Sequence, residues 1–226
     1  MSTARIALLT AILLASACLK AAGADEWEVI LERDGIVVSR RSAEGQRLPQ
    51  LRAVGEVPGT PYEVLAVLLD VPEHVDWRPD CAESRIVRRI SHWKSLTYTR
   101  IRTPWPLADR DVVVENEVLF IDPPSKVKVT FQAVAAPDVE RGRHVIRMPS
   151  VTGSYSIEAT QDGRSRVHYE LEADPGGSLP NWFVAIQSAR NPLRTLAGLR
   201  QQLNRTRGRY DQEIAQFPQG AATNRT

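Results

Sequence analysis

The chain has 226 residues, a formal net charge of +2, 42% hydrophobic residues and two cysteines. This composition is typical of a globular protein and excludes a disordered chain, a collagen-like repeat and a disulfide scaffold. Basic residues are scattered, whereas nucleic-acid binding needs them concentrated, so we expect no nucleic-acid partner. The length suits a single domain that needs neither a metal nor a disulfide for stability.

The first 24 residues have the features of an export signal. Arg5 precedes an apolar stretch over 6–14, and small residues follow up to Ala24. The stretch is too short to span a bilayer about 30 Å thick, so we expect cleavage after Ala24 and a periplasmic or secreted protein. In the alternative interpretation, Cys18 becomes the lipid-modified first residue of a lipoprotein. Cleavage after Ala24 would leave Cys81 as a lone cysteine.

The rest of the chain is predicted to form one domain over 25–207 that is rich in antiparallel strands. Apolar and polar residues alternate with a period of two, which is typical of strands with one buried face. Short connections with Pro-Pro, Asp-Gly and Arg-Gly turns favour antiparallel neighbours. The predicted strands lie at about 35–41, 51–57, 84–90, 93–102, 111–121, 126–135, 143–148, 153–160 and 165–173.

Two helices are predicted on either side of the main run of strands. A capping box that begins at Thr60 predicts a first helix, which ends near Asp70. An apolar stripe with 3.6-residue spacing predicts a long helix over 179–207, and we expect Pro192 to kink or break it. The last residues, 208–226, are predicted to be a flexible tail.

Two neighbouring strands show which side chains face the interior. The inner face is assigned to Thr97, Thr99, Ile101, Val114 and Asn116. On the outer, solvated face, Arg100 and Arg102 are predicted to pair with Glu115 and Glu117.

Sequence motifs for catalysis are missing. The four histidines are far apart and Cys81 stands alone, so no metal-ligand spacing is present. There is no nucleophile elbow, phosphate-binding loop or dinucleotide fingerprint. We therefore expect no catalytic residues, no metal and no cofactor, although polar residues at strand edges could form a site without a known motif.

A cavity for a hydrophobic molecule fits the pattern better. A strongly curved antiparallel sheet and one long amphipathic helix do not always close tightly, and the gap between them becomes an apolar cavity. Any such fold would place most of the candidate lining residues in its core. A single candidate therefore does not indicate a ligand contact, and only the set as a whole does. Besides the inner-face residues above, the predicted ligand-binding set contains Val129, Phe131, Arg147, Tyr155, Ile157, Tyr169, Phe183, Ile186 and Leu193.

Three polar residues are candidates for orienting a ligand. A buried Thr97 or Asn116 needs a partner, which could be a ligand headgroup, a bound water or an internal hydrogen bond. Arg147 could hold an acidic headgroup or be an ordinary surface residue of a strand.

Four segments resemble motifs of the START lipid-transfer domain family, and the resemblance extends over about 27–207. It implies an α+β helix-grip fold, in which a curved antiparallel sheet wraps around a long C-terminal helix. It also implies a tunnel for a sterol, phospholipid, sphingolipid or other hydrophobic molecule, with a lid formed by that helix and nearby loops. The segments are Asp34-Gly35-Ile36-x-Val38-x-Arg40, Asp76-Trp77-Arg78-Pro79, Pro104-Trp105-Pro106-Leu107-Ala108-Asp109-Arg110-Asp111 and Asp174-Pro175-Gly176-Gly177.

The resemblance also bears on the ligand and on the proline-rich segment. Some family members place an acid and an arginine inside the tunnel, where Thr97 and Asn116 stand here, so a neutral or weakly polar ligand is expected. Arg110 and Asp111 are expected to hold the proline-rich loop by hydrogen bonds. Trp105 is expected to pack against the core; an exposed Trp105 could instead contact a membrane transiently.

The sequence thus predicts a monomer that binds a lipid or sterol-like molecule reversibly and carries it. One alternative is a helix-grip enzyme, a cyclase or hydrolase, that acts on an apolar substrate. Another is an interaction module in which the cavity is vestigial and filled by side chains.

Overall fold

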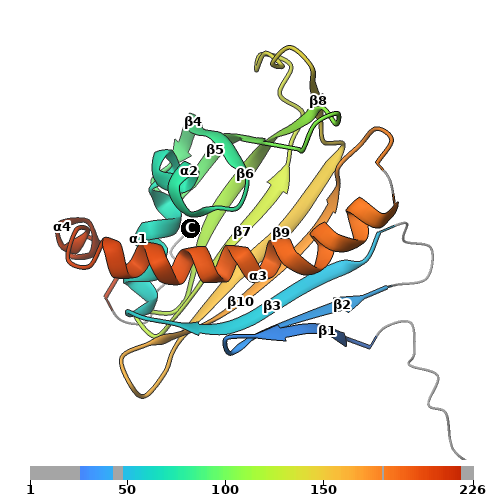
Figure 1. Ribbon diagram of the computed structural model, residues 1–226. Coiled ribbons are helices and arrows are strands. Elements are labelled where there is room, and N and C mark those ends of the chain that lie inside the picture. The colour runs from blue at the N-terminus through green and yellow to red at the C-terminus, as the bar shows by residue number, and fades with distance from the viewer. Residues whose placement is uncertain (1–25, 43–47, 180, 220–226) are drawn as a thin grey trace, which may run out of the picture.

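A computed structural model describes residues 26–42, 48–179 and 181–219, with only the backbone described over 181–189 (Figure 1). The predicted export signal and the alternative lipidation site at Cys18 lie outside these residues. Within them, no helix is long and apolar enough to span a membrane.

The described strands form one 10-stranded sheet with the order β1-β2-β3-β10-β9-β7-β6-β5-β4. Every pairing along this path is antiparallel, and β8 adds a short parallel pairing to β6. The strands are β1 (Glu28–Arg33), β2 (Ile36–Arg41), β3 (Gln50–Val57), β4 (Cys81–Ser91), β5 (Lys94–Ile101), β6 (Asp109–Asp122), β7 (Lys126–Ala133), β8 (Val145–Arg147), β9 (Ser150–Ala159) and β10 (Ser165–Asp174).

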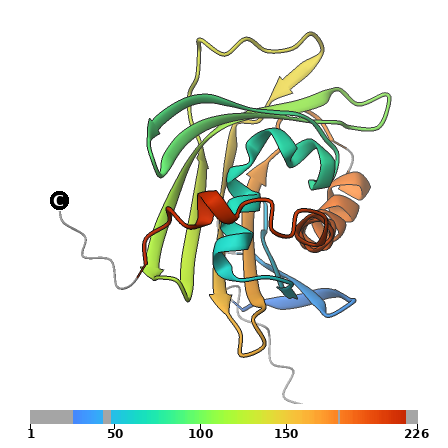
Figure 2. The same cartoon turned by 90° about the vertical axis from the view of Figure 1, so that its left-hand side faces the viewer.

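The helices lie on the concave side of this sheet, and Figure 2 shows the strands curving around them. The long helix α3 crosses the sheet and contacts β2 and β3 (Figure 1). This arrangement confirms the predicted α+β class, a curved antiparallel sheet wrapped around a C-terminal helix. The helical elements are α1 (Pro61–Leu69), the 3-10 turn η1 (Val71–Glu73), α2 (His74–Trp77), α3 (Asn181–Arg205) and α4 (Asp211–Ile214).

The start of α1 is set by the predicted capping box. The Glu63 amide donates to Thr60 Oγ1 at 3.3 Å, and Glu63 Oε2 accepts from the Thr60 amide at 2.8 Å. Pro61 occupies the first turn, where no intrahelical donor is needed. The helix then buries an apolar face that includes Val64 and Leu65. Full burial of each such side chain stabilises the fold by about 1.5–3 kcal/mol.

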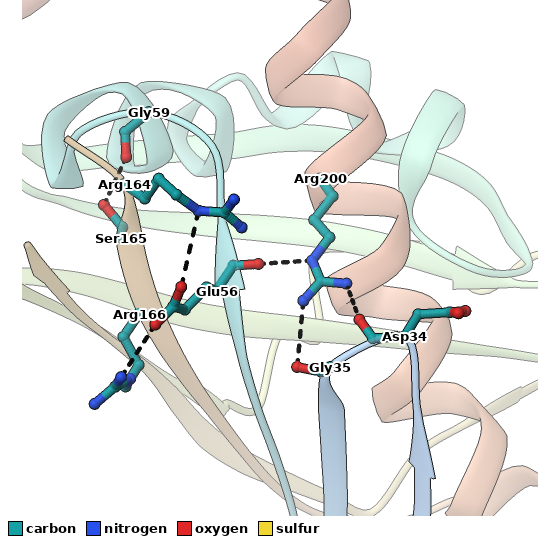
Figure 3. Close-up of polar contacts among 8 residues, drawn as sticks. All are labelled: Asp34, Gly35, Glu56, Gly59, Arg164, Ser165, Arg166 and Arg200. Carbon is teal, nitrogen blue, oxygen red and sulfur yellow. Dashed lines mark hydrogen bonds and ion pairs between the residues drawn. The ribbon is translucent and has the colours of Figure 1, made fainter. Parts of the chain in front are cut away.

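Arg200 joins α3 to the edge of the sheet (Figure 3). Its guanidinium donates to the carbonyl oxygens of Glu56 and Asp34, both at 2.6 Å, and to that of Gly35 at 3.4 Å. Gly35 has a φ of +66°, which the turn between β1 and β2 requires. The Glu56 side chain in turn pairs with Arg166 at 3.0 Å. A side chain of the helix therefore binds backbone carbonyls of the β1–β2 turn and of the end of β3.

Gly198 lets α3 touch the end of α2. A Cβ atom at this position would lie 2.1 Å from the carbonyl oxygen of Trp77, which no packing allows. The missing side chain therefore brings α3 against the backbone that precedes Arg78.

The predicted charge pairs between β5 and β6 are wrong. Arg100 lies opposite Asp111, and its Nε is 3.4 Å from the Asp109 carboxylate. Glu115 and Glu117 instead pair with Lys94, at 2.8 and 3.6 Å. The long connection over 102–108 joins the two strands, and pairing starts at Ile101 and Arg110. This register places Arg100 far from Glu115.

The last helix and the tail also differ from expectation. α3 continues through Pro192 without a break, and Thr195 Oγ1 donates to the Asn191 carbonyl at 2.9 Å. Residues 208–219, predicted to be flexible, pack on the fold. Tyr210 and Phe217 are buried, and the Tyr210 hydroxyl donates to the Asp70 carboxylate at 2.8 Å.

Candidate binding cavity

A cavity of about 250 Å³ lies between the inner face of the sheet, α2 and α3. It receives side chains from β3, β4, β5, β6, β7, β9 and β10, and its wall is largely apolar. The apolar part of the lining includes Leu51, Leu68, Trp77, Ile101, Val112, Val114, Val129, Phe131, Met148, Val151 and Leu171. The predicted gap between a curved sheet and the long helix is therefore present, and the described side chains do not fill it.

Most of the predicted ligand-binding residues line this cavity. The alternation of apolar and polar residues correctly identified which side chains of each strand face inward. These are Thr99, Ile101, Val114, Asn116, Val129, Phe131, Tyr155 and Tyr169. Thr97, Ile157, Leu193 and Arg147 are not in the lining. The side chains of Phe183 and Ile186 lie outside the described part of the chain.

Asn116 and Thr97 form the internal hydrogen bond that was one of the alternatives. Asn116 Nδ2 donates to Thr97 Oγ1 at 2.9 Å and to the Val114 carbonyl at 3.4 Å. Thr97 is buried, while Asn116 reaches the cavity surface. The amide nitrogen is therefore satisfied without a ligand.

Arg147 supports the sheet and does not point to a ligand. Its Nε and Nη2 contact the two carboxylate oxygens of Asp111 at 2.7 and 3.1 Å. Arg147 also donates to the Val139 carbonyl at 3.3 Å. Asp111 is fully buried, so this fork ties β8 and its loop to β6. Breaking such a buried pair is strongly destabilising, because the remaining charge stays without a partner.

Arg110 connects two loops at the end of the cavity near β8. Nη1 donates to the Ala108 carbonyl at 2.5 Å, while Nε and Nη2 donate to the carbonyls of Pro175 and Gly176, both at 3.4 Å. Pro175 and Leu179 belong to the cavity lining. The proline-rich loop and the segment that leads into α3 are therefore held by one guanidinium.

Arg78 is the main residue that sequence reasoning missed. It caps the end of α2, where its amide donates to the His74 carbonyl at 2.9 Å, and its side chain lines the cavity. No carboxylate in the described residues forms an ion pair with it. The sequence contains the motif Asp76-Trp77-Arg78-Pro79, but the motif does not show where the Arg78 side chain points. That direction depends on the short helix α2.

The guanidinium of Arg78 lies beside the phenol groups of Tyr155 and Tyr169 and has a hydrogen bond to that of Tyr169. The two tyrosines are opposite each other on β9 and β10, and their rings stack with centroids 4.6 Å apart. Burial raises the pKa of each phenol, so both keep their protons. The Tyr155 hydroxyl is buried, and none of the described residues forms a hydrogen bond with it.

His74 lines the same cavity but carries no charge. Its Nε2 lies 3.0 Å from the Leu68 carbonyl, and burial lowers its pKa to about 3. Arg78 is therefore the one formal charge on the described lining at neutral pH. In the part of the chain that the structure describes, no three His, Cys, Asp or Glu residues gather as a metal site would require.

Trp105 differs from its expected packing against the core. It stands in the loop between β5 and β6 and is 92% exposed. Its neighbours Pro104 and Pro106 are exposed as well. A large aromatic ring held in water by a loop is typical of a contact surface.

The chain belongs to the START domain family, whose model matches residues 13–192. It is 27% identical over 165 residues to the phosphatidylcholine transfer protein of Mus musculus, which covers 72% of this chain and 76% of the relative.

Two solved structures share this fold. The STAR-related lipid transfer protein fragment from Xanthomonas axonopodis is 28% identical, with a TM-score of 0.72, covering 80% of this chain and 99% of that one. Human STARD10 has a TM-score of 0.73 at 21% identity, over 84% of this chain and 78% of that one. The predicted helix-grip fold is thereby confirmed.

We predict that Arg110→Met lowers stability without changing which ligand is bound. The substitution leaves three partly buried carbonyls without their donor, and we expect the free energy of unfolding to fall by about 2–4 kcal/mol. Urea denaturation measures the change, and Arg143→Met, an exposed residue of a nearby loop, should shift it by less than about 0.5 kcal/mol. An unchanged unfolding curve together with lost binding would assign Arg110 to the ligand instead.

Proposed function

We propose that this protein binds one hydrophobic molecule, a lipid or sterol-like compound, in the cavity beneath α3 and carries it reversibly. The observation that carries the proposal is the apolar cavity itself, open between sheet and helix in a chain of the START family. Removal of apolar surface from water supplies about 25 cal/mol per Å², so a ligand that buries about 400 Å² would gain about 10 kcal/mol before entropic costs. The transfer activity named for the mouse relative supports a carrier role.

Weak contacts on α3 support reversible loading. Arg194 pairs with Asp80 at 2.8 and 3.2 Å, at the surface, next to the lining residues Asn191 and Thr195. Exposed ion pairs of this kind contribute about 0–1 kcal/mol, so separating them during ligand entry is inexpensive.

We predict that Val114→Phe, which fills the cavity, weakens lipid binding at least about 10-fold, equal to 1.4 kcal/mol of binding free energy. Val114 lies on the wall, so the ring occupies the space that a ligand would use. Binding of a fluorescent lipid to the purified protein measures the effect.

The matched control is Val29→Phe, which adds the same ring at an exposed position on β1. Both variants should unfold at a free energy close to that of the wild type. Normal lipid binding by folded Val114→Phe would contradict a ligand in this cavity.

We propose further that Trp105 makes transient contact with a membrane during loading and release. Tryptophan prefers the interface between hydrocarbon and water, where its ring is buried and its N–H stays hydrated. The exposed ring stands in the loop that Arg110 connects to the segment before α3. Contact at this loop would bring the membrane close to Pro175 and Leu179 of the cavity lining.

We predict that Trp105→Ala slows lipid transfer between vesicles several-fold while leaving equilibrium lipid binding unchanged. Ile121→Ala is the matched control, because it removes an exposed apolar side chain from the opposite end of β6. A transfer assay with labelled donor vesicles compares the variants. Equal rates for Trp105→Ala and wild type would show that this residue plays no part in transfer.

We propose that the protein works in the periplasm or after secretion. The support is the apolar stretch over 6–14 with small residues up to Ala24. Mass spectrometry of the protein from its own cell envelope should find a chain that begins at Asp25. A lipid-modified N-terminus at Cys18 would show the lipoprotein alternative, and an intact Met1 in the cytoplasm would refute export.

A further inference from the structure

We propose that Arg78 binds the polar end of the ligand, and that this ligand carries an anionic oxygen, from a carboxylate or a phosphate, and no cationic group. The inference rests on the proposed lipid-binding function and specifies the class of ligand. It replaces the expectation of a neutral ligand, which was based on Thr97 and Asn116 alone. The charge in the cavity comes from the end of α2 and not from those two strands.

An uncompensated charge in an apolar wall calls for a counter-charge. Desolvating a guanidinium costs several kcal/mol unless hydrogen bonds or an ion pair offset it. Two other arginines at this end of the described fold have such partners: Arg147 has Asp111, and Arg110 has three carbonyls. Arg78 has a hydrogen bond to the Tyr169 phenol, pairs with no carboxylate among the described residues and faces the cavity. A ligand oxyanion would therefore complete its coordination.

The two tyrosines add donors at the same place. The hydroxyl of Tyr155 is buried, protonated and without a partner, and a phenol O–H donates readily to an anionic oxygen. Tyr169 stacks on Tyr155 and also lies beside the guanidinium. The Arg78 guanidinium offers a planar fork that matches the oxygen geometry of a carboxylate or phosphate. Together they form a site that favours negative charge.

The same arrangement disfavours a zwitterionic headgroup. A choline ammonium inside the cavity would lie near Arg78, and no aspartate or glutamate is present among the described lining residues to balance it. Like charges repel strongly where water is excluded. We therefore infer a preference that differs from the ligand named for the phosphatidylcholine transfer protein of mouse.

The experiment compares a fluorescent fatty acid, cis-parinaric acid, with its methyl ester. The two probes share one apolar chain and differ at the polar end, where the ester replaces the negative charge with a methyl group. Wild-type protein should bind the acid about 10- to 100-fold more tightly than the ester, as a charge-assisted hydrogen bond predicts. This ratio is measured without any variant, so it does not depend on how well a mutant folds.

Arg78→Met should bring the ratio to about one by weakening the acid and sparing the ester. Arg78→Lys keeps the charge without the fork and should retain part of the preference. Arg89→Met removes an exposed arginine of β4 and should leave the ratio unchanged. Thermal unfolding of each variant confirms that the comparison is made on folded protein.

A competition arm distinguishes the two sources of the oxyanion. Palmitoyl lysophosphatidic acid and lysophosphatidylcholine are tested for displacement of the bound probe. Stronger displacement by the phosphatidic form than by free palmitate assigns the site to a phosphate, and the reverse assigns it to a carboxylate. In both cases the choline form should compete about 10-fold less well.

Two results would overturn the inference. One is equal binding of acid and ester by the wild type, which would leave lipid binding intact but remove the role of charge. The other is an acid preference that survives in folded Arg78→Met, which would place the oxyanion elsewhere. If neither probe nor any competitor binds the wild type, the proposed function itself fails.

Discussion

The position of α3 over the concave face of the sheet is the constraint on which the rest of the structure depends. Gly198 lets the helix touch the end of α2, and Arg200 fixes it to the turn between β1 and β2. These contacts hold the helix against the rim of the curved sheet. Because these contacts lie at the rim, α3 does not pack directly on all of the central strands β6, β7 and β9. The space left between these strands and the helix is the cavity.

The polar groups of the interior fall into two kinds. Asp111 with Arg147, and Asn116 with Thr97, satisfy one another and hold strands and loops in place. Arg78 pairs with no carboxylate among the described residues, the Tyr155 hydroxyl has no hydrogen-bond partner among them, and both residues line the cavity. Buried polar groups are almost always paired in folded proteins, so a guanidinium without a carboxylate next to an unpaired hydroxyl, in an otherwise apolar wall, supports the proposed place for the polar end of a ligand.

The sequence predicted the fold well where local signals agree with tertiary packing. The capping box at Thr60 and the alternation in β6 and β7 gave the right elements and inner faces. Prediction from the sequence failed where a strand register or a side-chain direction depends on segments that are distant in the chain. The register between β5 and β6 follows from a loop whose length carries no pairing signal, and β1 was missed because its residues are mostly exposed. The direction of Arg78 depends on a four-residue helix held by α3.

Arg110 links the two loops at one end of the cavity, the proline-rich loop and the segment before α3, by hydrogen bonds to both. Its guanidinium contacts the backbone of the tryptophan-bearing loop and that of the segment entering α3. A force that displaces one loop must stretch the hydrogen bonds to the other, so the two cannot move independently while these bonds hold. A displacement of the exposed tryptophan loop would thus be transmitted to Pro175 and Gly176, in the segment that leads into α3.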